Sequence, residues 1–363
     1  MAANKLRVMH MIGASKPGGA EMFALRLLVA QHKRKDIELL AVVREKSWLE
    51  GVLREAGVAV TTVPFGGMFD WRTKGLVKRI AHDFKPQVIQ SWMNRATRFV
   101  PRPSYSRRWA TVARLGGFYD LKYYRGRVHN LIGNTQAICD YCIAHGWKAS
   151  AVEMISNFIP EPAIDWKDDV KLGREAMRKK LEIGKDDCVL MMAGRLHKVK
   201  GIDVALGALA ELPERFKLLL VGEGPLREDL EKLAESLHVS QRIIWAGWQD
   251  SVTPYAAVAD VWLAPSRHEP LGNTVLDAWA HEVPVIASRT GGLEMLLADG
   301  NSGILVEVGD VDALRDAVLK LEGNAALRKR MVKGGLKVFS RDYSEDGIVG
   351  KYVAYYQELG RKD

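Results

Sequence analysis

Hydrophobic and polar positions alternate along this chain between two patterns. Short apolar runs of strand length are separated by longer segments whose apolar positions recur every three or four residues, the spacing of amphipathic helices. The predicted strands cover 5–13, 38–43, 59–65, 87–93, 110–116, 129–135, 188–196, 216–224, 242–248, 261–266, 283–288 and 303–308. The predicted helices cover 18–33, 47–57, 74–86, 201–211, 225–237, 253–258, a segment starting near 273, and 347–359. Regular alternation of this kind predicts the α/β class, with parallel sheets covered by helices on both faces.

One segment interrupts the alternation. Residues 156–169 are rich in proline and acidic residues, and the strand–helix pattern begins again after them, which indicates an interdomain linker. A chain of 363 residues is long enough for two domains. We therefore predict two doubly wound, Rossmann-like domains facing each other across a cleft, at 1–165 and 166–340. The residues 341–363 are predicted to form a helix that packs back on the first domain.

Composition narrows the class of protein. No apolar run approaches the ~18 residues of a membrane span, and the N-terminal segment is typical of a first strand, not of a signal peptide. The three cysteines, Cys139, Cys142 and Cys188, form no disulfide framework, which favours a reducing cytoplasm. Cys139 and Cys142 have C-x-x-C spacing, but they lie in a helical pattern without a second pair, and a zinc or redox role is not favoured.

Charge is distributed unevenly. Residues 1–160 hold 25 Lys and Arg against 11 Asp and Glu, whereas residues 161–363 hold 28 against 33. Within 95–127, Asp120 is the single acid among nine cations and several aromatic residues; the cations are Arg95, Arg98, Arg102, Arg107, Arg108, Arg114, Lys122, Arg125 and Arg127. A basic first half predicts an anionic partner: an acidic substrate, an anionic membrane surface or nucleic acid. A solvated face of a basic protein is the competing interpretation.

Two loops have the composition of phosphate sites. Gly18 and Gly19 follow a predicted strand and open a helix, which lets backbone N–H groups approach an anion, although a plain strand-to-helix turn has the same pattern. Arg195 and Lys200 lie between a strand and a helix in the second half. Such a pair can stabilise the negative charge of a departing diphosphate, but two solvated surface cations remain an alternative at this point.

A third candidate is the stretch 266–288, "SRHEPLGNTVLDAWAHEVPVIAS". Pro270 and Gly272 indicate a turn that carries Glu269, and a helix is predicted to begin near Asn273 and Thr274. We expect Asp277 in the first turn of this helix, where it could bind ribose or only complement the helix dipole.

The motifs "GRLHKVKG", "VGEGP", "SRHEPLGNTVLDAWAHEVPVIASRTGG" and "GILVEVGDVDAL", with "GGAE" near the start, closely resemble retaining glycosyltransferases of the GT-B fold. The resemblance is to family 4, which includes bacterial lipopolysaccharide and lipid glycosyltransferases, and it covers nearly the whole chain. It implies a nucleotide-sugar donor, a UDP-sugar or GDP-mannose, bound mainly by the second domain without a metal or other cofactor. It also implies front-face attack, in which a departing phosphate oxygen helps to accept the acceptor's proton.

The resemblance assigns residues by motif. Arg195 and Lys200 would contact the diphosphate, and Glu269 the donor sugar; these three are the predicted catalytic residues. The predicted donor-binding residues are Gly18, Gly19, Gly222, Gly224, Gly247, Leu271, Gly272, Asn273, Thr274, Val275 and Asp277. Two departures stand out. The family usually has Glu where this chain has Asp277, and many members have a first-domain His where this chain has Gly116 and Gly117. Asn94, Arg95 and Asp120 are the substitute candidates for the acceptor side.

The predicted function is transfer of a hexose with retention to an anionic glycolipid, most readily lipopolysaccharide core or a related cell-envelope glycan. The enzyme is expected in the cytoplasm, held to the inner membrane face by its basic first domain. A nucleotide-sugar epimerase on the same fold is the enzyme alternative. A nucleic-acid-binding protein is the remote one, and it leaves the second-half motifs unexplained.

Overall fold

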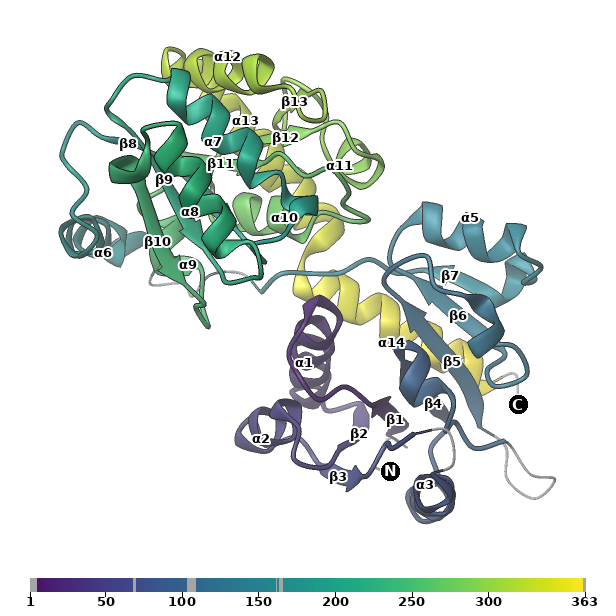
Figure 1. The fold of residues 1–363 in the computed structure, drawn as a ribbon. Coiled ribbons are helices and arrows are strands. Elements are labelled where there is room, and N and C mark those ends of the chain that lie inside the picture. The colour runs from purple at the N-terminus through teal and green to yellow at the C-terminus, as the bar shows by residue number, and fades with distance from the viewer. Residues whose placement is uncertain (1–4, 68–69, 103–108, 161, 163–165, 362–363) are drawn as a thin grey trace. The chain divides into compact units, whose positions relative to one another are not determined.

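The computed structural model describes residues 5–67, 70–102, 109–160, 162 and 166–361, and it divides into two compact units. The first unit runs to Phe158 and resumes at Glu345, and the second runs from Ile159 to Ser344 (Figure 1). Phe158 packs in the core of the first unit and Ile159 in that of the second, so the division falls between these neighbours. The sequence predicted these boundaries between 165 and 166 and between 340 and 341, so the first was predicted too late and the second too early. Residue 165 lies outside the described residues.

The first unit is a seven-stranded parallel sheet in the order β3-β2-β1-β4-β5-β6-β7. Its strands are β1 Leu6–Ile12, β2 Ile37–Arg44, β3 Val60–Val63, β4 Val88–Trp92, β5 Ala110–Leu115, β6 Asn130–Gly133 and β7 Val152–Met154. Its helices are α1 Gly19–His32, α2 Trp48–Glu55, α3 Trp71–Phe84, α4 Met93–Thr97, α5 Gln136–Ala144 and α14 Glu345–Arg361, with 3-10 turns η1 Leu121–Tyr123 and η2 Ala149–Ala151. α1, α2 and α14 contribute to the core on one face, and α3, α4 and α5 to that on the other.

The second unit is a six-stranded parallel sheet in the order β10-β9-β8-β11-β12-β13. Its strands are β8 Cys188–Ala193, β9 Phe216–Val221, β10 Ile243–Gly247, β11 Val261–Ala264, β12 Val285–Ser288 and β13 Ile304–Val306. Its helices are α6 Trp166–Lys180, α7 Ile202–Glu211, α8 Arg227–Ser236, α9 Thr253–Ala256, α10 Asn273–Ala280, α11 Gly291–Leu296, α12 Val311–Glu322 and α13 Ala325–Val338, with short turns η3 Lys198–Lys200, η4 Ser240–Arg242 and the π-helical η5 Phe339–Tyr343.

Both cores have helices on each face of the sheet, as the alternating pattern predicted. In the second unit, α7, α8, α12 and α13 pack on one face, and α9, α10, α11 and η5 pack on the other. Several helices begin where a side chain accepts a hydrogen bond from a first-turn N–H: Asp70 for α3, Thr135 for α5, Asp310 for α12 and Asn324 for α13. Such caps satisfy backbone donors that a helix cannot satisfy internally.

The linker prediction was too long at its C-terminal end. Residues 156–169 were expected to form an irregular connection, but α6 begins at Trp166 and continues to Lys180. Arg174 attaches α6 to the second unit by donating to the Ala257 carbonyl at 2.7 Å and to Asp260 Oδ1 at 2.8 Å. The acidic residues of the stretch therefore belong partly to a helix.

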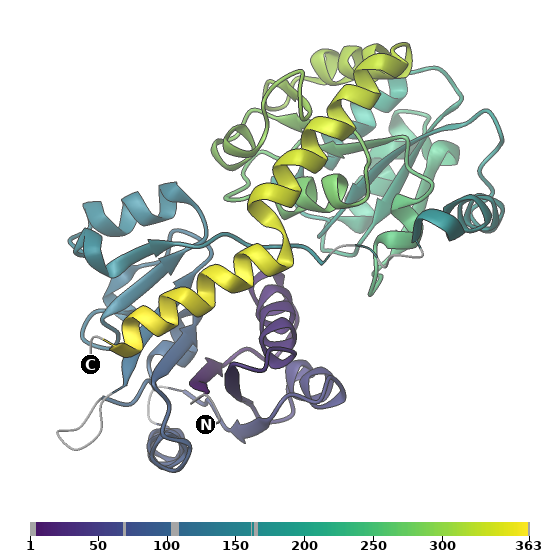
Figure 2. The same ribbon diagram turned by 180° about the vertical axis from the view of Figure 1, so that it is seen from behind.

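The C-terminal helix belongs to the first unit, along which it runs in Figure 2. Tyr352 and Tyr356 of α14 are fully buried in the core that it shares with α1 and β4. The Tyr356 hydroxyl donates to Gln90 Oε1 at 2.6 Å. This buried polar contact fixes α14 to the central strand β4 and makes it part of the first unit's core.

Candidate functional site

The predicted phosphate-binding residues of the second unit follow two adjacent strands. β8 and β11 are neighbours in the sheet, and the strand order reverses between them. Arg195 and Lys200 come after the carboxyl end of β8, and Glu269 and α10 come after that of β11. Doubly wound sheets bind ligands at this switch point, because the loops there leave toward opposite faces. The fold thus brings together residues that are about 70 positions apart in the sequence.

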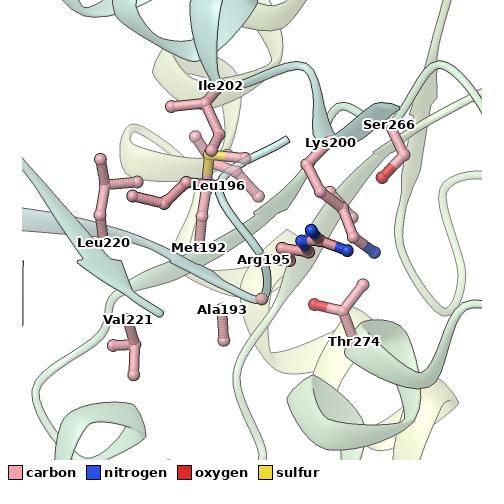
Figure 3. Close-up of a pocket in the computed structure, with 13 residues that line it drawn as sticks. Met192, Ala193, Arg195, Leu196, Lys200, Ile202, Leu220, Val221, Ser266 and Thr274 are labelled. Atoms are coloured by element: carbon pink, nitrogen blue, oxygen red, sulfur yellow. The ribbon is translucent and has the colours of Figure 1, made fainter. Parts of the chain in front are cut away.

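A hollow that is open to solvent lies at this point, with about 320 Å³ of empty space when that solvent is included. Arg195, Lys200, Ser266 and Thr274 provide its polar wall, and the remainder is mostly apolar, from the ends of β8, β9 and β11 together with Leu196 and Ile202. Figure 3 shows Arg195, Lys200 and Thr274 among the residues that line this hollow. Two cations and the start of a helix on one hollow form a binding geometry suited to a phosphate group.

Lys200 also contacts the predicted sugar-binding carboxylate. Its Nζ donates to Glu269 Oε2 at 2.5 Å. The side chains are 25% and 14% exposed, so the carboxylate is the more buried partner. This ion pair connects the η3 turn with the loop after β11, and it rules out the interpretation of Lys200 as a solvated surface cation. Arg195, by contrast, is exposed.

The helix of the stretch 266–288 starts where the sequence predicted, but its acidic residue Asp277 lies beyond the first turn. α10 begins at Asn273, with Gly272 preceding it at φ 90°. Asp277 is the fifth residue of the helix, so the expectation that it lies in the first turn was wrong, and with it the alternative that it only complements the helix dipole there. A ribose contact by Asp277 stays a prediction. The first turn of α10 contains no acidic residue.

The backbone and side-chain donors at the start of α10 are partly engaged. The Val275 N–H donates to the Gly272 carbonyl at 2.9 Å. The indole of the buried Trp262 donates to Thr274 Oγ1 at 2.7 Å, which orients this hydroxyl toward the sheet. Leu271 is buried, and Asn273 is half-buried at the helix start. A phosphate contact by Thr274 or Val275 stays a prediction.

Comparison with known proteins gives the family. Residues 173–338, most of the second unit, match the model of the family "Glycosyl transferases group 1". Over 341 residues the chain is 31% identical to the lipopolysaccharide core biosynthesis glycosyltransferase LpsE of Rhizobium meliloti, covering 93% of this chain and 95% of LpsE. It is 30% identical to LpsD of the same organism over 352 residues, covering 96% and 97%. The chain belongs to the group 1 glycosyltransferases.

The structure of this glycosyltransferase is similar to that of Anabaena HepE, which was crystallised with UDP-glucose. The TM-score is 0.82 at 18% identity, over 97% of this chain and all of HepE. This similarity confirms the predicted fold, that of the GT-B glycosyltransferases.

The glycines predicted on the donor side have packing roles of their own. A Cβ at Gly222, after β9, would lie 2.0 Å from the Gly194 carbonyl oxygen, and one at Gly224 would lie 2.3 Å from the Leu196 carbonyl oxygen. These glycines let the end of β9 approach the loop that carries Arg195. Gly247, with φ 68°, ends β10 one strand further from the cavity.

The remaining candidates belong to the first unit. Gly18 and Gly19 open α1, with Gly18 as the N-cap residue in an extended conformation. Asn94 and Arg95 lie on α4, where Asn94 Oδ1 is buried without a hydrogen-bond partner among the described residues. Asp120 caps η1 by accepting from the Lys122 N–H at 3.0 Å, and it pairs with the Lys122 ammonium at 2.6 Å. A structural role accounts for Asp120, and the acceptor assignments stay predictions.

The basic, aromatic segment 95–127 is partly buried in the first unit. Trp109, Arg114 and Tyr124 are buried, while Phe118 and Tyr123 are exposed by 50% and 39%. The Arg114 guanidinium stacks on Phe23 at 4.7 Å and on Trp92 at 5.3 Å from the ring centres. Strand β5 takes the middle of the segment into the sheet, so Arg114 is not part of a basic surface, whereas Arg95, Arg102, Lys122 and Arg125 are exposed. An anionic partner for the first unit stays a prediction. Arg107 and Arg108 lie outside the described residues.

The cysteine spacing has no catalytic consequence in the described structure. Cys139 and Cys142 are both buried on α5, and burial raises the pKa of their thiols to about 11 and about 12. Thiolate is the form that binds metal or exchanges disulfides, and burial disfavours it here.

Sequence reasoning missed two contributors near the cavity. Ser266 lines the hollow, and Arg267 forms a two-pronged ion pair with Asp203. Both belong to the quoted motif, but neither was singled out. The sequence signal for a partner of Arg267 was weak. Asp203 is an acid at a helix start, but no spacing rule links it to a residue 64 positions away.

Proposed function

We propose that this glycosyltransferase transfers a hexose from a nucleoside-diphosphate sugar to a glycolipid acceptor, with retention of the anomeric configuration. The observation that supports this most directly is the gathering of Arg195, Lys200 and the start of α10 around one hollow at the switch point of the second unit. The printed names of LpsE and LpsD support lipopolysaccharide core or a related cell-envelope glycan as the acceptor.

In the proposed reaction the acceptor hydroxyl oxygen attacks the anomeric carbon from the face that the diphosphate leaves. The bond between that carbon and the phosphate oxygen breaks, and the acceptor's proton passes to a phosphate oxygen of the departing nucleoside diphosphate. Arg195 and Lys200 stabilise the negative charge that builds on the diphosphate, and Glu269 accepts hydrogen bonds from sugar hydroxyls. In this scheme fixed cations supply the charge that a metal ion supplies elsewhere, and transfer is expected to continue in EDTA.

The test is a transfer assay with purified protein, UDP-sugars and GDP-mannose, and lipopolysaccharide core acceptors of different lengths. Shifts in thermal unfolding with UDP and GDP identify the base, because a ligand that binds only the folded state stabilises it. NMR of the product gives the anomeric configuration. An inverted product contradicts the retaining mechanism, and a converted donor sugar in the absence of acceptor supports an epimerase instead.

We further propose that the enzyme works at the inner face of the cytoplasmic membrane, attached through its basic first unit. Among the described residues, no helix combines the length and apolar character needed to cross a membrane. Helix α3 has a surface that suits an anionic lipid face: Trp71 is 74% exposed, Lys74 lies 5.0 Å from the centre of its ring, and Arg72, Lys78 and Arg79 are exposed. Tryptophan at an interface combined with cations favours anionic headgroups.

A further inference from the structure

One arginine joins the two loops of the second unit that carry the proposed donor-binding pair. The segment 197–203 follows β8 and includes Lys200, whereas the segment 265–269 follows β11 and includes Glu269. Arg267 belongs to the second segment, two residues before Glu269, and contacts the first segment with both its backbone and its side chain.

The hydrogen bonds of Arg267 hold the two segments at a defined distance and orientation. Its backbone N–H donates to the Val199 carbonyl at 2.8 Å, and Nη1 donates to the Lys198 carbonyl at 3.1 Å. Nη1 and Nη2 also donate to the two carboxylate oxygens of Asp203, at 2.7 and 2.6 Å. A guanidinium facing a carboxylate with two parallel hydrogen bonds restricts the angle as well as the distance between its partners.

The position of Asp203 on α7 favours its ion pair with Arg267. It lies in the first turn of α7, where a negative charge is favourable. The hydrogen bonds from Arg267 lower the pKa of Asp203, so the pair is ionised at neutral pH. Gly201 adds a close backbone contact: it has φ 65°, and a Cβ there would lie 1.9 Å from the Pro265 carbonyl oxygen. The two segments are therefore packed against each other along their length.

We propose that the Arg267–Asp203 pair is a positioning device that holds the Lys200 ammonium against Glu269 and in line with the cavity. Among the described residues, the wall of the cavity includes Lys200 but neither Arg267 nor Asp203. The pair thus acts through Lys200 and Glu269 and not by contact with the donor. The proposal rests on the proposed function, because its consequence is a rate of sugar transfer.

Arg267→Ala and Asp203→Asn are the variants that test it. A misplacement of about 1 Å at reacting groups lowers rates by up to about 100-fold, so kcat is expected to fall about 10- to 100-fold. The donor KM is expected to change less, because the cations still attract the diphosphate. Exchanging the two charges, Arg267→Asp with Asp203→Arg, is expected to recover part of kcat. In a Lys200→Ala background, Arg267→Ala is expected to cause little further loss.

Arg315→Ala is the matched control. Arg315 pairs with Glu211, the last residue of α7, whereas Asp203 is in its first turn, and both arginines are partly exposed. This variant removes an ion pair from the same helix at the end far from the cavity, and kcat is expected to stay at the wild-type value. Thermal unfolding of both variants reports any general loss of folding.

A second readout does not depend on transfer. The NMR resonance of the Lys200 ammonium, assigned by its loss in Lys200→Ala, is expected to move toward that of exposed lysines in Arg267→Ala but not in Arg315→Ala. An unchanged Lys200 resonance or an unchanged kcat in Arg267→Ala overturns the positioning role, as does an equal loss of kcat in Arg315→Ala. A wild-type protein that transfers no sugar contradicts the proposed function, while the resonance still decides whether the pair positions Lys200.

Discussion

The Lys200 ammonium nitrogen lies 2.5 Å from Oε2 of Glu269, although 69 positions separate the two residues in the sequence. The contact spans the switch point of the second unit, since Lys200 follows β8 and Glu269 follows β11. It brings the proposed phosphate-binding cation into contact with the proposed sugar-binding carboxylate. A donor that binds both groups therefore has its phosphate and its sugar held by residues that also hold each other.

Glu269→Gln is expected to lower kcat by about 10²- to 10³-fold, because a neutral amide cannot replace a carboxylate that accepts from Lys200 and, in the proposed reaction, from sugar hydroxyls. Folding is expected to be nearly intact, since glutamine preserves the shape of the side chain. The measurement is steady-state transfer alongside circular dichroism. Transfer at the wild-type rate with a folded variant would remove Glu269 from the site.

Arg195→Ala is expected to weaken nucleotide binding with little effect on stability, because Arg195 is exposed and lines the cavity. A charge-assisted hydrogen bond to phosphate contributes about 1.5–3 kcal/mol, so Kd for UDP or GDP is expected to rise about 10- to 100-fold. Calorimetric titration measures this change. Lys198→Ala is the control, since Lys198 is an exposed cation on the same loop but outside the cavity wall. Equal effects of the two variants would indicate a diffuse attraction.

The sequence was sufficient to predict the fold and that Arg195, Lys200 and Glu269 follow strands of the second unit, because strand periodicity and parallel topology together bring loop residues to one edge of a sheet. The roles of these three residues stay predictions. The error on Asp277 was not one of the fold, because α10 starts at Asn273 as predicted and counting from that residue makes Asp277 the fifth of the helix. Composition alone also cannot tell that β5 takes Arg114 of the segment 95–127 into a core with Phe23 and Trp92. The partners of Arg267 depend on which loops the fold brings together.

Stability is expected to fall with acid through His10. His10 is fully buried; its Nδ1 accepts from the Trp92 indole at 3.1 Å, and its Nε2 contacts Gln31 Oε1 at 3.0 Å. Burial lowers the pKa of His10 from 6.5 to about 3. Between these values the unfolded chain binds the extra proton, so the free energy of unfolding falls as pH decreases, by up to about 1.4 kcal/mol per unit from this group.

Denaturant unfolding from pH 7.5 to 4.5 measures this dependence. His10→Asn is expected to be less stable at pH 7.5, because a contact to Trp92 or Gln31 is lost, but its stability is expected to depend less on pH below 6.5. The same slope in both proteins would assign the acid sensitivity to other groups.

The Tyr356 hydroxyl is expected to contribute to the folding of the first unit. Tyr356→Phe leaves the buried Gln90 Oε1 without its donor, and an unsatisfied buried acceptor costs about 1–3 kcal/mol. Tyr123→Phe removes a hydroxyl from a side chain that is 39% exposed and is expected to cost little. Denaturant midpoints of the two variants make the comparison, and equal midpoints would contradict the attachment of α14 through this contact.

Vesicle binding is expected to depend on α3. Each Lys or Arg near an anionic surface contributes about 1 kcal/mol, so replacing Arg72, Lys78 and Arg79 by Gln is expected to weaken binding about 100-fold. Trp71→Ala removes an indole that is 74% exposed, and it is expected to weaken binding further. Co-sedimentation with phosphatidylglycerol vesicles, and with phosphatidylcholine vesicles for comparison, measures both effects.

Trp248→Ala is the control, because Trp248 is 57% exposed on the second unit. Binding through α3 is expected to decrease with salt and to be weak on phosphatidylcholine, since exposed charges are screened within about 10 Å at 0.1 M salt. If the α3 variants bind as tightly as Trp248→Ala, the membrane contact lies elsewhere on the protein.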